Sequence, residues 1–167
     1  LDVSLVPVRE AINKLSSDGL IKLTPHIGAR VANINRGEVD EIQMIRTELE
    51  CLATGLLANE ITVEQLGKLE KIVAESEKAF DHGKYDLYQK INRRFHFSLY
   101  EASSHQILAT IIKELYQRLQ LVPTLPWTRE RAEKSLREHK EILSALANHD
   151  GALAKNMLRK HQSARWH

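Results

Sequence analysis

The sequence predicts an all-α fold: an antiparallel bundle of six to seven helices, preceded by a partial helix-turn-helix unit with a short β-hairpin. Three observations predict it. The 167 residues include only seven glycines and four prolines, so few positions force a helix to end. Aromatic residues make up 5% of the chain, which leaves little of the material that favours strands. Apolar residues recur at helical spacing between the few turn signals.

The composition is typical of a globular protein in a reducing compartment. Hydrophobic residues make up 43% and charged residues 28%, and the formal net charge of +2 is too small to indicate a nucleic-acid partner by itself. The single cysteine, Cys51, excludes an internal disulfide and fits the cytoplasm. No apolar run is long enough to span a membrane, and the sequence shows no signal-peptide pattern. The chain opens at Leu1 without an initiator methionine, so we expect a fragment of a longer protein.

Residues 1–34 predict a helix followed by a hairpin. Ser4 is a good N-cap, Pro7 falls in the first turn, and Gly19 is placed to end the helix. Two short extended segments follow at 20–24 and 29–32, joined by a turn.

This order of elements matches the second half of a winged helix-turn-helix. Ser4 and Arg9, near the start of the helix, would then reach the major groove, and the hairpin would form the wing. A plain helix–hairpin module with no nucleic-acid role fits the same pattern, and the local charge does not exclude it.

Residues 35–167 predict the bundle itself. Asn35 and Glu38 form a capping box at the start of its first helix. Short breaks rich in turn residues separate the helices, which favours antiparallel neighbours. The expected helices lie at residues 36–59, 62–82, 84–101, 104–122, 128–148 and 150–165.

Three histidines occupy core-facing positions on three of these helices. Asn92 and His96 are four residues apart and share a face, while His139 and His161 stand where leucine would be expected. An unpaired buried polar group costs on the order of 1–3 kcal/mol, so these rings need partners. A divalent cation would supply one: zinc or nickel, with manganese as a third candidate. The alternative is that each histidine is a core residue hydrogen-bonded to a neighbour.

The N-terminal residues resemble a known family of regulators. The "VSLVPVREAI" string at 3–12, with "DGLI" at 18–21 and Gly28, resembles the DNA-binding domain of the GntR family. The resemblance implies that Ser4 and Arg9 touch DNA and that the wing around Gly28 approaches the minor groove.

Two positions depart from that pattern. Leu5 and Ile27 stand where the family usually carries basic residues, which should weaken phosphate binding. The helices that normally precede the recognition helix are also missing, so we expect this chain alone to bind DNA poorly.

The second resemblance covers residues 36–165 and is to the FCD effector domain of the FadR subgroup. It implies that a divalent metal is held by Asn92, His96, His139 and His161, that a small carboxylate effector completes the coordination, and that the regulator is a homodimer. Many members carry Asp in place of Asn92, so the site here is one charge more positive. The motifs that carry the resemblance are "Asn92-x-x-x-His96", "Glu138-His139-x-x-Ile142", "Asp150-x-x-x-Ala154-x-x-Met157-x-x-x-His161" and "Arg46-x-x-Leu49-Glu50".

The leading hypothesis is therefore a DNA-binding regulator, a repressor by expectation, with a partial winged helix-turn-helix at 1–34 and a metal- and effector-binding domain at 35–167. Arg46 is a further candidate for the effector site because its guanidinium can pair with a carboxylate. An intrahelical pair between Arg46 and Glu50 is the alternative.

Two other functions fit the three-histidine pattern. One is a metal-dependent hydrolase, which would need a general base beside the metal-bound water. Glu138 and Glu141 flank His139 but are expected to point elsewhere on the helix. The other is a purely structural metal bundle with no sensing role.

Overall fold

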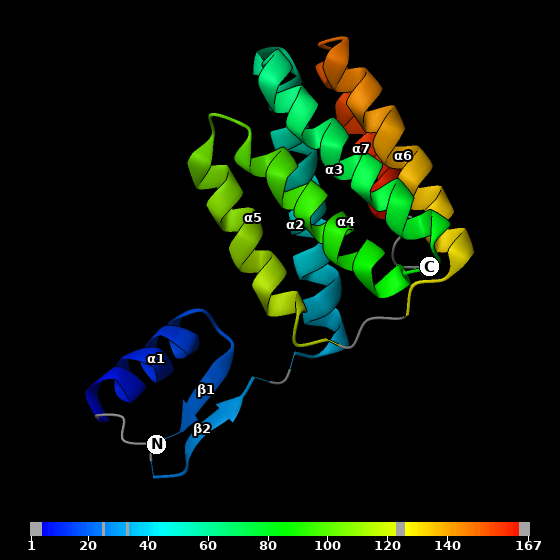
Figure 1. Ribbon diagram of the computed structural model, residues 1–167. Helices are drawn as coiled ribbons and strands as arrows, with labels where there is room; N and C mark the ends of the chain where they lie inside the picture. Colours follow the sequence, from blue (N-terminus) through cyan, green and yellow to red (C-terminus); the bar gives the residue numbers. More distant parts are fainter. Residues whose placement is uncertain (1–4, 25, 33, 123–125, 164–167) are drawn as a thin grey trace.

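The computed structural model describes residues 5–24, 26–32, 34–122 and 126–163 (Figure 1). Within this part of the chain, seven helices and a two-stranded sheet are present. The elements in chain order are α1 Leu5–Ser17, β1 Ile21–Thr24, β2 Gly28–Val31, α2 Arg36–Glu60, α3 Val63–Asp81, α4 Tyr85–Glu101, α5 Gln106–Leu119, α6 Arg129–Ala147 and α7 Gly151–Ser163.

The N-terminal unit is the predicted helix and hairpin. The turn after α1 runs through Gly19 at a φ of 71°, and the Leu20 amide donates to the Leu15 carbonyl at 2.9 Å. This left-handed residue is the predicted helix end, and glycine adopts it without strain. β1 and β2 pair antiparallel from Ile21–Val31 to Thr24–Gly28. The proposed N-cap, Ser4, lies outside the described residues.

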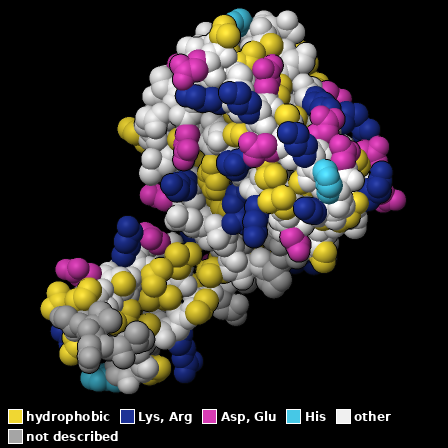
Figure 2. All heavy atoms as spheres, in the orientation of Figure 1, with side chains coloured by type: hydrophobic (Ala, Val, Ile, Leu, Met, Phe, Trp, Pro, Cys, Tyr) yellow, Lys and Arg dark blue, Asp and Glu magenta, His cyan; other side chains and the backbone are white. Residues whose placement is uncertain are grey.

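The described part of α1 buries none of its side chains. Its apolar residues, such as Leu5 and Val6, are largely exposed, and Figure 2 shows apolar side chains gathered on this unit. Exposed apolar patches of this kind are typical of surfaces that contact another element or partner.

The bundle begins with the predicted capping box. The Asn35 Oδ1 accepts a hydrogen bond from the Glu38 amide at 3.0 Å, and the Glu38 carboxylate accepts from the Asn35 amide at 3.0 Å. A second capping box, between Thr62 and Gln65, starts α3. These reciprocal bonds satisfy amides that the helix cannot pair internally.

The six bundle helices agree with the predicted ones to within three residues at each described end. The largest difference is at α5, which ends at Leu119 rather than at residue 122. The last two residues predicted for the final helix, 164 and 165, lie outside the described part of the chain. Helix α2 runs through the bundle, where it contacts α4, α5, α6 and α7.

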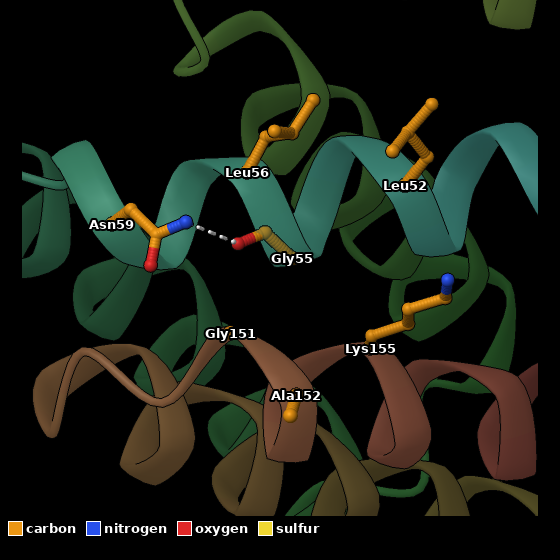
Figure 3. A pocket seen from close by; sticks show the side chains of 7 residues that line it. All are labelled: Leu52, Gly55, Leu56, Asn59, Gly151, Ala152 and Lys155. Atoms are coloured by element: carbon orange, nitrogen blue, oxygen red, sulfur yellow. Dashed lines mark hydrogen bonds between the residues drawn. The ribbon is translucent and has the colours of Figure 1, made fainter.

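Helices α2 and α7 approach each other closely at Gly55 and Gly151. A Cβ atom on Gly151 would lie 2.6 Å from the backbone oxygen of Gly55, so no larger side chain fits without movement of the backbone. Beside this contact is a shallow groove of about 340 Å³ (Figure 3). The close approach sets the distance between the two helices, and α7 carries one of the three core histidines. The groove is lined by Leu52, Gly55, Leu56, Asn59, Gly151, Ala152 and Lys155.

Candidate metal centre

The three core-facing histidines meet inside the bundle. His96 comes from α4, His139 from α6 and His161 from α7, and their exposed fractions are 6%, 0% and 2%. One ring nitrogen from each histidine lies within 4.8 Å of the other two. Three imidazole nitrogens bound to one zinc ion would be about 3.3 Å apart, so small side-chain shifts would bring the rings into coordination distance. The cluster predicted from the sequence is therefore present.

Each histidine belongs to the buried stripe of its helix. In α4 the buried residues include Ile91, Asn92, Phe95 and His96, which recur at helical spacing. The same periodicity buries His139 in α6 and His161 in α7.

Aromatic rings pack around the cluster. Phe95 stacks on His139 with ring centroids 4.2 Å apart, and it meets His96 edge to face at 5.6 Å. The centroids of His139 and His161 are 4.8 Å apart. Such packing excludes water and restricts the rotamers of the imidazoles, which is what a preorganised metal site requires.

Two contacts of Nδ1 atoms orient His96 and His161 toward each other. Nδ1 of His96 lies 3.2 Å from the Tyr100 hydroxyl, and Nδ1 of His161 lies 2.8 Å from Oε2 of Glu138. The opposite nitrogens, Nε2 of both rings, are 3.1 Å apart. Outer partners on Nδ1 with converging Nε2 atoms are the arrangement found around metal-binding histidines.

The expectation that Glu138 points away from the histidines is wrong. Glu138 is buried beside His161, because α6 packs against α7 as well as α3 and its buried arc is wider than a single stripe. Burial raises the pKa of the Glu138 carboxyl, while Lys134, Lys160 and Arg137 act in the opposite direction. Glu141 follows the expectation, since its side chain is 40% exposed and faces Lys160.

Sequence reasoning also missed Tyr100. It lies four residues after His96 on the same helix, so its spacing could have indicated the contact. The contact between Glu138 and His161 joins two helices, and no local pattern marks it.

Asn92 lies one turn before His96 and is 2% exposed. Its Oδ1 accepts a hydrogen bond from the Ser135 hydroxyl at 3.3 Å. Its role as a ligand stays a prediction.

Arg46 is buried in α2 and forms the intrahelical ion pair that was the alternative to effector binding, with Nε 3.0 Å from Oε1 of Glu50. The other oxygen of Glu50 accepts a hydrogen bond from Nε2 of Gln162, the residue after His161. The guanidinium also lies 5.5 Å from the Tyr116 ring centroid. Arg46 is thus connected to the end of α7 that carries a cluster histidine, and its contact with an effector stays a prediction.

The remaining candidates lie in the N-terminal unit. Arg9 is exposed on α1, and Gly28 is exposed at the start of β2 with a φ of 104°. Ser4 lies outside the described residues. Exposure is what DNA contact requires, and the contacts themselves stay predictions.

Comparisons with known proteins identify a matching domain family and similar proteins. Residues 41–164 match the model of the FCD domain. The HTH-type transcriptional regulator YdhC of Bacillus subtilis strain 168 is 34% identical over 161 residues, which cover 95% of this chain and 72% of YdhC. The HTH-type transcriptional repressor RspR of Escherichia coli K12 is 29% identical, covering 96% of this chain and 71% of RspR.

A solved structure agrees with these relatives. The structure of Escherichia coli McbR/YncC superposes with a TM-score of 0.83 at 25% identity, covering 98% of this chain and 83% of that protein.

No helix in the described ranges is both long and apolar enough to cross a membrane. The relatives are named transcriptional regulators, which makes this protein a regulator rather than the metal-dependent hydrolase considered as an alternative. The matches to the FCD model and to YdhC show that the chain belongs to the FCD-domain group of GntR-family transcriptional regulators.

Proposed function

We propose that the chain is a metal-dependent sensor of a small carboxylate, and that effector binding modulates its affinity for operator DNA. The domain at 35–167 would hold one divalent cation through His96, His139 and His161, with Asn92 as an additional oxygen donor. The unit at 1–34 would contact DNA. The observation that carries the proposal is the convergence of three buried imidazoles from three helices within 4.8 Å.

The donor set favours a borderline cation. Neutral imidazole suits zinc and nickel, and the amide oxygen of Asn92 also suits manganese. Three neutral imidazoles and a neutral amide leave the charge of the cation, about +2, uncompensated by direct ligands. An anion with oxygen donors is therefore the expected effector, and a carboxylate is a common metabolite group of this kind.

Arg46 is the second feature that supports a carboxylate effector. It is a buried cation whose guanidinium can form two parallel hydrogen bonds with a carboxylate. Glu50 pairs with it in the structure, so an effector would share or replace that carboxylate.

DNA binding would fall to the N-terminal unit. Arg9 would read a base edge from α1, Ser4 would also touch DNA, and the turn at Gly28 would approach the minor groove. The exposed apolar face of α1 suits the packing of further helices of a winged helix-turn-helix. A homodimer would recognise a pseudo-palindromic operator, and repression is the expected outcome, as the name of RspR states for that relative.

Elemental analysis of protein purified without chelator or metal-affinity resin tests the metal site. We expect one divalent cation per chain, and removal of the cation should lower the melting temperature because the cation binds the native state. His139→Ala should abolish metal binding. His82→Ala, which removes an exposed imidazole at the end of α3, should leave it unchanged. A wild-type protein that contains no metal and whose melting temperature does not change with EDTA would contradict the proposal.

A further inference from the structure

The contact between Glu138 and His161 joins two buried groups on neighbouring helices. Oε2 of Glu138 lies 2.8 Å from Nδ1 of His161, and both side chains are nearly inaccessible to solvent. When Glu138 is ionised, its carboxylate can only accept a hydrogen bond, so Nδ1 of His161 must carry the proton and donate. The lone pair of a neutral His161 is then on Nε2, the atom that faces His96.

We propose that Glu138 is a positioning residue of the metal site: it holds His161 in the tautomer that presents Nε2 to the cation, and it supplies a negative charge next to that cation. This inference rests on the proposed function, since it assigns a role within the same site. The proposed ligands at 92, 96, 139 and 161 would all be neutral, and the buried carboxylate of Glu138, in contact with His161, would supply compensating charge.

The second oxygen of Glu138 supports a role beyond packing. Oε1 is buried and has no hydrogen-bond partner among the residues that the structure describes. A buried carboxylate with one satisfied oxygen stabilises a fold poorly, because its desolvation is only partly offset. A divalent cation held by the adjacent histidines would offset the rest of this desolvation cost.

The position of the proton on His161 also determines the tautomer of His96. If His161 has no proton on Nε2, the 3.1 Å contact between the two Nε2 atoms is a hydrogen bond only when His96 carries its proton on Nε2. The Tyr100 hydroxyl then donates to Nδ1 of His96. A cation on Nε2 of His96 would require the proton on Nδ1 instead, where the Tyr100 hydroxyl could accept it. His161 would therefore be preset for the metal, whereas His96 would change tautomer with no net release of protons.

Nitrogen-15 NMR of histidine-labelled protein reads these tautomers directly, and zinc titration against a competing chelator reads affinity. In the metal-free wild type we expect His161 protonated at Nδ1 and His96 at Nε2, with only His96 changing when Zn²⁺ is added. Glu138→Ala should remove the tautomer preference of His161 and weaken Zn²⁺ binding roughly 10- to 100-fold.

Two further variants separate position from charge. Glu138→Gln keeps an acceptor oxygen for Nδ1 but removes the charge, so we expect an intermediate loss of Zn²⁺ affinity. Glu141→Gln removes the same charge from the same helix at a position that faces Lys160, and it should bind Zn²⁺ as the wild type does. Circular dichroism checks that all variants remain helical, and the isosteric Glu138→Gln variant keeps the test valid if Glu138→Ala does not fold.

A wild-type His161 protonated at Nε2 would overturn the assignment, as would wild-type Zn²⁺ affinity in both Glu138 variants or an equal loss in Glu141→Gln. If the wild type binds no metal at all, the proposed function fails. The spectra of the metal-free wild type and variants then decide by themselves whether Glu138 sets the tautomer of His161.

Discussion

Gln162 of α7 donates a hydrogen bond to the carboxylate of Glu50 in α2, 112 residues earlier in the chain. The same carboxylate pairs with Arg46, and all three side chains are buried. Because Gln162 directly follows His161, this contact connects the histidine cluster to the helix that leads from the N-terminal unit.

Replacing Glu50 should destabilise the protein strongly. Glu50→Ala removes the buried carboxylate that pairs with the guanidinium of Arg46, and we expect a loss of about 3–5 kcal/mol in the free energy of unfolding. Urea denaturation measures it. The control is Glu48→Ala on the same helix, which breaks an exposed pair with Arg159 and should cost less than about 1 kcal/mol. Equal effects of the two substitutions would contradict the burial argument.

Arg46 should determine the response to carboxylates. Citrate, lactate or a sugar acid should raise the melting temperature of the metal-loaded protein and have no effect on the metal-free protein. Arg46→Ala should weaken this shift, because one carboxylate contact is lost, without removing the metal. Thermal denaturation with and without metal is the measurement. A carboxylate screen with no metal-dependent shift would favour a purely structural role for the metal.

Gly151→Ala should destabilise the contact between α2 and α7. The added methyl group would meet the Gly55 backbone oxygen, and relieving that overlap should cost about 1–3 kcal/mol. Gly67→Ala is the matched control, because Gly67 lies within α3 and its Cβ would meet nothing within 4 Å. That substitution should stabilise the protein by about 0.5–1 kcal/mol through helix propensity. Thermal or urea unfolding of the two variants should therefore move in opposite directions.

Glu60 should make stability depend on pH. Hydrogen bonds from the Ser104 hydroxyl and amide, together with one from Ser103, lower the pKa of its carboxyl below the ordinary value. Its contribution is therefore complete above the unfolded-state pKa and is lost as the pH falls through the lower folded-state value. Glu60→Gln should cost about 1 kcal/mol at pH 7, since the group is partly exposed, and much less near pH 3. A cost that does not change with pH would exclude this linkage.

Arg9 should carry sequence-specific DNA contact. In the full gene product, Arg9→Ala should weaken binding to an operator selected from random DNA by about 1–3 kcal/mol, because a base-edge contact is lost. Its affinity for unrelated DNA should fall far less. Fluorescence anisotropy at fixed salt measures both affinities. Tight, sequence-selective binding by residues 1–167 alone would contradict the expectation that this chain binds DNA poorly.

Much of the fold could be predicted from the sequence because its signals are local. The capping box at Asn35 and the helix end at Gly19 depend on residues only a few positions apart. Helical periodicity likewise put His96, His139 and His161 on buried faces before their partners were known.

The tertiary structure alone decided which of those buried groups meet. Periodicity determines the face that a helix buries, but the axial offset and crossing angle of two helices determine which side chains touch across the interface. Those quantities depend on contacts between distant segments, such as the close approach of Gly55 and Gly151. For that reason the sequence by itself determined that the three histidines lie on buried helix faces. The pairing of Glu138 with His161 and of Glu50 with Gln162 followed only from how α6 and α2 pack against α7.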